Sequence, residues 1–157
     1  MTKNQLPETR RGYSHSFHVN KQKCHLILNT EIRNNKEEII ECFLEAGKFG
    51  TSLRGMTNAL SFAINVHLRY GGNIHDFLDA FEKMEFLPNG KTNNKEIQEV
   101  PSILSYIAQY IKLCESNGGY LKHKAKDKVT IMENFTDEQM ILEQEKALQS
   151  CNVKGGG

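Results

Sequence analysis

The apolar residues of this chain change their spacing at a pair of glycines, Gly47 and Gly50, and this change limits the folds that the chain can adopt. Upstream of the glycines, apolar and polar residues alternate, which is typical of strands with one buried face. Downstream, apolar residues recur every three or four positions, which is typical of amphipathic helices. Strands that come before helices favour an α+β fold over an alternating α/β fold.

Three segments have the alternating pattern, and the links between them are short. They are residues 12–20, 23–31 and 38–46, and mostly polar residues separate them. Consecutive strands with short links pair most simply as hairpins. We therefore predict a three-stranded antiparallel meander.

Two or three helices are expected to pack against this sheet. The first spans residues 51–70, with Thr or Ser to cap its start and two glycines to end it. Its apolar stripe is broad, so we expect this helix to be buried on more than one side. A second helix follows from Asn73 to the turn at 88–90. After a polar loop over 91–99, a third helix begins near Pro101, a residue favoured in the first turn.

A chain of 157 residues is long enough for one domain with its own core. We predict a flexible N-terminus over 1–11, the α+β domain over 12–114, a polar linker over 115–133, a C-terminal helix over 134–150 and a tail over 151–157. The last helix has a thin apolar side, which suits docking on a partner better than forming a core of its own.

Composition excludes several classes of function. The 20 Lys and Arg nearly balance the 19 Asp and Glu, so nucleic-acid binding is not expected. No apolar run approaches the roughly 18 residues that a membrane span requires, and the N-terminus has no hydrophobic signal core, so a cytoplasmic location is expected. The four cysteines are far apart, which favours free thiols in a reducing compartment.

The segment between the third strand and the first helix is the best candidate for a binding site. Its glycines let the backbone approach a ligand, and the amides at a helix start favour anions. Alternatively, the glycines only permit a tight turn, because the segment matches no established phosphate-binding motif. The candidate cradle for a phosphate or carboxylate consists of Gly47, Lys48, Gly50, Thr51, Ser52 and Arg54.

No catalytic residue, metal site or cofactor is predicted. His15 and His18 fall on opposite faces of one strand, which does not suit the convergent ligands of zinc. Phe77, Phe81 and Phe86 have the spacing of core residues. The chain contains no serine-hydrolase motif and no paired-carboxylate pattern, so we expect a binding module and not an enzyme.

The stretches EIIECFLEAGKFGTSLRGMTNALSFAINVHLRYGGNIHDFLDAFEKMEFLPNG and VPSILSYIAQYI resemble the TSCPD domain near the C-terminus of cobalamin-dependent (class II) ribonucleotide reductases. The resemblance covers residues 12–113 and implies the fold and a nucleotide-related context. Many such domains have a Cys-Pro pair before the last helix, where this chain has Val100-Pro101. The reductase's catalytic barrel, with its radical-forming and redox cysteines, is absent from this sequence, so reduction of ribonucleotides by this chain alone is not expected.

Two functional hypotheses remain open. In the first, the chain is a stand-alone accessory domain in nucleotide metabolism that contacts a reductase subunit or binds a nucleotide. In the second, it is a phage or mobile-element protein that sequesters a phosphorylated nucleotide or signalling molecule. Under either hypothesis a homo-oligomer is expected, because the broad apolar stripe of the first helix and the open face of a three-stranded sheet need cover.

Overall fold

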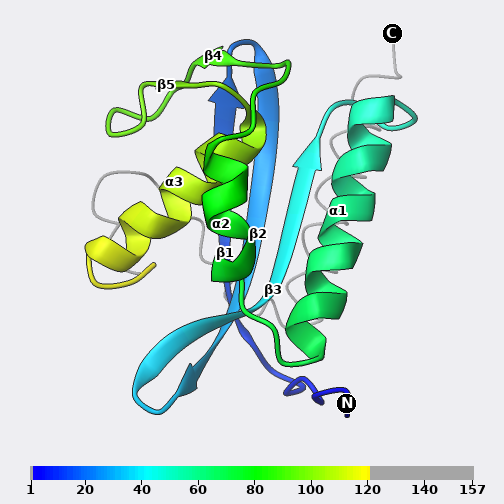
Figure 1. Ribbon diagram of the computed structural model, residues 1–157, viewed down its shortest axis with the longest axis vertical. Coiled ribbons are helices and arrows are strands. Elements are labelled where there is room, and N and C mark those ends of the chain that lie inside the picture. The colour runs from blue at the N-terminus through cyan, green and yellow to red at the C-terminus, as the bar shows by residue number, and fades with distance from the viewer. Residues whose placement is uncertain (1, 121–157) are drawn as a thin grey trace, which may run out of the picture.

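The computed structural model describes residues 2–120, and its strands form the predicted meander. The strands β1 (Arg11–Val19), β2 (Gln22–Arg33) and β3 (Lys36–Ala46) pair antiparallel in the order β1-β2-β3 (Figure 1). The strands β2 and β3 are longer than predicted because Asn34 and Asn35 adopt positive φ angles of 50° and 60°. Asparagine tolerates this conformation, so a two-residue turn joins the strands and their pairing continues up to Arg33 and Lys36, next to the turn.

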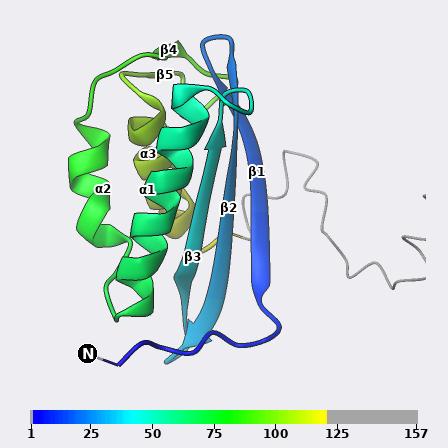
Figure 2. The ribbon, with the colours of Figure 1, turned by 90° about the vertical axis from the view of Figure 1, so that its right-hand side faces the viewer.

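Three helices follow, and they lie on one face of the sheet (Figure 2). They are α1 (Ser52–Arg69), α2 (His75–Glu82) and α3 (Ile103–Ser116). The third helix begins after Pro101 and not at it, because the Ser102 side chain accepts a hydrogen bond from the Ser105 amide and caps the helix there.

The predicted polar loop over 91–99 needs a correction. Its ends pair as two short strands, β4 (Gly90–Lys91) and β5 (Glu99–Val100). Between them Ile97 is buried. The prediction missed this pair because strands of two residues are too short to show an alternating pattern.

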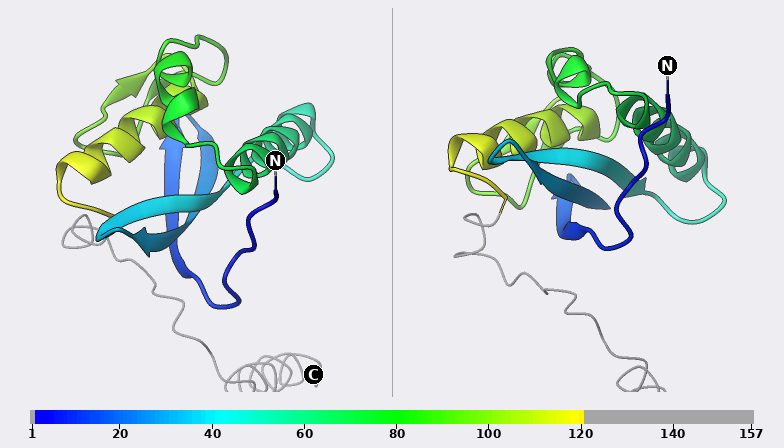
Figure 3. Two further views of the ribbon diagram at one scale, coloured as in Figure 1. Left: turned by 60° about the horizontal axis from the view of Figure 1, so that its bottom comes forward. Right: turned by 90° about the horizontal axis from the view of Figure 1, so that it is seen from below.

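The core lies between the sheet and the helices. Phe17 of β1 stacks on Tyr106 of α3 with ring centroids 4.1 Å apart, and both side chains are fully buried. Next to them His15 stacks on Tyr110 at 3.9 Å. Seen from below, α3 and α1 lie over the same side of the sheet (Figure 3). The core therefore joins the first strand to the last described helix.

The helix α1 closes the outer edge of the sheet. Because β3 is an edge strand, some of its backbone amides have no neighbouring strand to bond. The Leu44 amide instead donates to Ser61 Oγ at 2.8 Å, and the Cys42 amide donates to Asn65 Oδ1 at 2.7 Å. These bonds tie the helix to the strand in one register.

Only one side of α1 is buried within the described chain, where more than one was expected. The buried residues are Thr57, Ser61, Ile64 and Leu68. Outside this buried stripe, Met56 and Phe62 are 70% and 72% exposed. The difference has a physical reason: an apolar pattern indicates which residues favour burial, but not whether this chain supplies the cover.

The predicted helix over 134–150, the predicted tail and most of the predicted linker lie outside the described residues. The part of the linker that is described, residues 115–120, begins with the end of α3. It finishes with Tyr120, which is buried beside Tyr13 at a ring-centroid distance of 5.5 Å.

Replacing Asn65 by Ala should lower the free energy of unfolding by about 1–3 kcal/mol, because the Cys42 amide then loses its acceptor. Urea denaturation followed by circular dichroism measures this loss. Asn117→Ala is the control, since Asn117 is exposed at the end of α3 and should change the free energy by less than about 0.5 kcal/mol. Equal effects of the two substitutions would contradict the role given to the edge bonds.

Candidate functional site

The turn from β3 into α1 requires glycine at positions 47 and 50. Gly47 and Gly50 have φ angles of 80° and 85°, in the left-handed region that favours glycine. A Cβ atom on Gly47 would also lie 2.9 Å from Thr51 Oγ1. The backbone of the turn therefore accounts for both glycines without a ligand.

Thr51 is the cap of α1, as expected from the sequence. Its hydroxyl donates to the Lys48 carbonyl at 2.7 Å and accepts from the Arg54 amide at 3.3 Å. The Thr51 amide also donates to the Lys48 carbonyl. Two of the amides at the start of the helix are thus already bonded, which leaves fewer donors for an anion than the sequence indicated.

Arg54 is turned toward the sheet. Its Nη2 atom lies 3.0 Å from Glu45 Oε1 on β3. Its Nε atom is buried and has no hydrogen-bond partner. In the same turn Lys48 and Ser52 are exposed, and Phe49 is 95% exposed. The residues of the predicted cradle therefore lie around one turn, but the Arg54 guanidinium is already paired with the Glu45 carboxylate.

A second feature of this region is an apolar groove that the sequence pattern did not reveal. The groove has a volume of about 530 Å³ and separates the first half of α1 from the segment that follows α2. Phe86 was expected to be in the core, but it lies beyond the end of α2 and is 39% exposed at the rim. Leu87 beside it is 79% exposed. The lining residues are Leu44, Ser52, Leu53, Met56, Thr57, Leu60, Phe86, Leu87, Ile103 and Leu104.

The groove opens next to the turn, because Ser52 belongs to both. Its volume is within the range of small-molecule sites, and its walls are mostly apolar. A smaller and more polar cavity of about 130 Å³ lies near the other end of α1, around Arg69 and His75. The apolar groove is therefore the better candidate for a binding site.

Two of the histidines link one helix to another. His67 lies 2.7 Å from Asp76 and joins the end of α1 to α2, while His75 lies 2.8 Å from Glu115 of α3. The Asn73 amide, and then the His67 side chain, hold the pKa of Asp76 below its ordinary value. Within residues 2–120 no three His, Cys, Asp or Glu side chains are placed to hold a metal ion.

The described thiols are buried and free. Burial raises the pKa of Cys24 and of Cys42 to about 12, and that of Cys114 to about 11. A thiol is nucleophilic as the thiolate, so these three cysteines stay protonated and unreactive near neutral pH. Within residues 2–120 no helix has the length and apolar content needed to cross a membrane.

Comparison with known proteins gives matches at the level of sequence. The chain is 28% identical over 144 residues to the vitamin B12-dependent ribonucleotide reductase of Streptomyces clavuligerus, covering 89% of this chain and 15% of the reductase. It is 32% identical over 108 residues to the enzyme of the same name from Streptomyces coelicolor, covering 69% of this chain and 11% of that enzyme. It is also 32% identical over 103 residues to the vitamin B12-dependent ribonucleotide reductase of Agrobacterium fabrum, covering 65% of this chain and 8% of that enzyme.

The chain thus spans only a small part of the relatives that it matches. No solved structure matches it. The TSCPD domain family model matches residues 3–114, which is most of the chain and includes the turn, the groove, α1, α2 and most of α3. The chain belongs to the TSCPD domain family, whose members include a region of vitamin B12-dependent ribonucleotide reductases.

Proposed function

We propose that this chain is a non-catalytic binding module of ribonucleotide metabolism and that it binds a segment of a reductase partner in the apolar groove. The observation that carries the proposal is the exposure of Leu87 and Phe86 beside a groove lined by aliphatic side chains. Apolar residues grouped in a concave surface are typical of protein-interaction sites, where an amphipathic segment places its apolar side.

The chemistry of the described residues supports a binding role. The three described thiols are protonated, and the histidine–carboxylate contacts are pairs that connect helices. The reductases that share the family carry this region as a small fraction of a much longer chain. We therefore expect this module to act by binding to such an enzyme.

Leu87→Glu should weaken binding to the purified catalytic chain of a B12-dependent reductase from the same cells at least tenfold, because it places a charge in an apolar contact. Biolayer interferometry with the full chain measures the dissociation constant. Ile32→Glu is the matched control, since Ile32 is an exposed apolar residue of β2 that does not line the groove. The proposal fails if the unaltered chain does not bind, or if both variants bind equally.

A second candidate function is the capture of a phosphorylated nucleotide at the start of α1. The observation that favours it is the buried Nε of Arg54, which has no hydrogen-bond partner, close in sequence to the exposed Lys48. Both groups could bond an anion held at the turn. The groove would then hold the base, because the two features share Ser52.

Thermal unfolding in the presence of nucleotides, cyclic nucleotides and ADP-ribose tests this second function. A ligand at a hundredfold excess over its Kd should stabilise the fold by about 2.7 kcal/mol. Arg54→Ala should abolish the stabilisation, whereas Arg33→Ala should keep it, because Arg33 is paired with Glu31 away from the turn. The absence of stabilisation by every compound would exclude capture of these ligands.

The raised thiol pKa values lead to a further prediction. In a Cys151→Ser variant at pH 8, a thiol reagent should modify Cys24, Cys42 and Cys114 only when urea unfolds the chain, since all three remain protonated and buried in the fold. Counting the released chromophore over time measures this reactivity. Rapid modification of the folded variant would show an accessible thiolate and would reopen the case for redox chemistry.

A further inference from the structure

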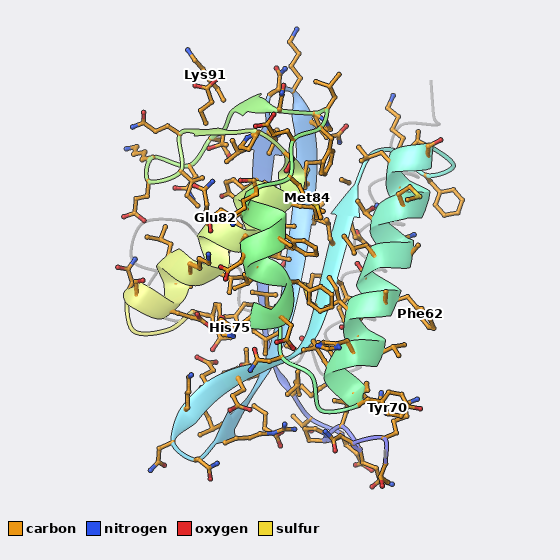
Figure 4. All side chains as sticks on the ribbon, viewed as in Figure 1. Phe62, Tyr70, His75, Glu82, Met84 and Lys91 are labelled. Atoms are coloured by element: carbon orange, nitrogen blue, oxygen red, sulfur yellow. The ribbon has the colours of Figure 1, made fainter. Side chains whose placement is uncertain are left out.

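The solvent-facing side of α1 carries no charge. Every exposed residue of this helix is apolar, small or an uncharged polar residue, and Tyr70 continues the row beyond its end. Phe62 and Tyr70 point away from the body of the molecule (Figure 4). The exposed residues of the row are Ser52, Gly55, Met56, Asn58, Ala59, Phe62, Ala63, Val66 and Tyr70.

The charged groups of the same helix all have partners within the described chain. Arg54 pairs with Glu45, and Arg69 donates from Nε to the Asn4 carbonyl at 2.9 Å. His67 contacts Asp76. A helix on the surface of a monomer usually presents charged and polar residues to water, whereas a helix that is apolar around most of its circumference is covered. The outer row, named here the α1 face, therefore has the composition of a contact surface.

We propose that the α1 face binds the α1 face of a second copy of this chain in a symmetric dimer. A twofold contact brings one patch against itself, so any net charge on it would repel its own copy. The α1 face avoids this repulsion because its residues are uncharged. The lack of charge favours a second copy over a partner that would be recognised by charge.

The shape of the face also suits two packed helices. Gly55, Ala59 and Ala63 recur every four residues and let another helix approach closely. Phe62 and Val66 stand beside this small-residue ridge and can fill the space next to the partner's ridge. Residues near the middle of the helix meet their own copies in a symmetric pair.

The exposed area is close to what a stable dimer needs. The helix is about 27 Å long. Its large exposed side chains, together with Phe49 in the preceding turn, offer on the order of 600 Å². A stable interface buries about 800 Å² on each partner. The α1 face thus supplies most of the area that a stable interface requires.

The dimer is independent of the proposed groove function. The groove lies on the side of α1 that faces α3, where Leu53 and Leu60 line it, and the dimer uses the outer side. Ser52 and Met56 belong to both surfaces and are therefore not used in the tests. Either proposal can fail without the other.

Light scattering on the full chain during size-exclusion chromatography tests the dimer. A chain of 17.9 kDa should elute with a mass of about 36 kDa at tens of micromolar. Phe62→Glu should give the monomer mass, because it buries two like charges near the symmetry axis. Phe62 is 72% exposed, so this change should leave the circular dichroism spectrum unaltered. The control Leu87→Glu, in the groove, should keep the dimer mass.

Cross-linking distinguishes a second copy from other occupants of the α1 face. In a Cys151→Ser background, Ala59→Cys should be joined to its own copy by a short bismaleimide, whereas Lys21→Cys in the turn between β1 and β2 should not. The natural thiols of the described chain are buried and do not compete. The cross-linked product is read as a doubled mass on a denaturing gel.

Three outcomes would overturn the proposal. They are a monomer mass at every concentration tested, a dimer that survives Phe62→Glu, and equal cross-linking of the two cysteine variants. A monomer whose α1 amides are nevertheless protected in hydrogen exchange would assign the cover to residues 121–157 of the same chain. That result would also overturn the dimer.

Discussion

The arrangement of this domain depends on two hydrogen bonds between α1 side chains and the backbone of β3. Ser61 and Asn65 accept from amides that an edge strand would otherwise leave unpaired. Because both acceptors lie on the buried side of α1, the bonds set the rotation of the helix about its axis as well as its position. The outward direction of Phe62, the inward direction of Leu60 and the location of the groove follow from that rotation.

The parts of the fold that depend on local pattern could be predicted from the sequence. Alternation indicated the three strands, and the spacing of three and four indicated α1 with Thr51 or Ser52 as its cap, of which the structure has Thr51. The ends of β2 and β3 were missed because they depend on the conformation of Asn34 and Asn35, which no apolar pattern records. The pair of β4 and β5 was missed because its strands of two residues are too short to show a pattern, and the bridge beside it joins Thr92 to the distant Val19.

The candidate site was harder to predict because it is built from distant parts of the chain. The sequence showed that Arg54 follows the turn, but it did not show that the Arg54 side chain pairs with Glu45 of β3. The groove exists only where the segment after α2 comes to rest beside α1, so Phe86 looked like a core residue until that placement was known. Likewise, the broad apolar stripe of α1 indicated a need for cover without indicating its source.

The contacts at the two borders of the sheet have a consequence for how this protein behaves when concentrated. Side chains of α1 occupy the border at β3, and at β1 the His18 amide bonds Asn93 while Val19 forms a bridge with Thr92. Strand-by-strand extension into fibres needs unpaired edge amides, and the bonds at His18, Cys42 and Leu44 remove three of them. The bonded parts of the two edge strands therefore oppose edge-to-edge aggregation of the described sheet.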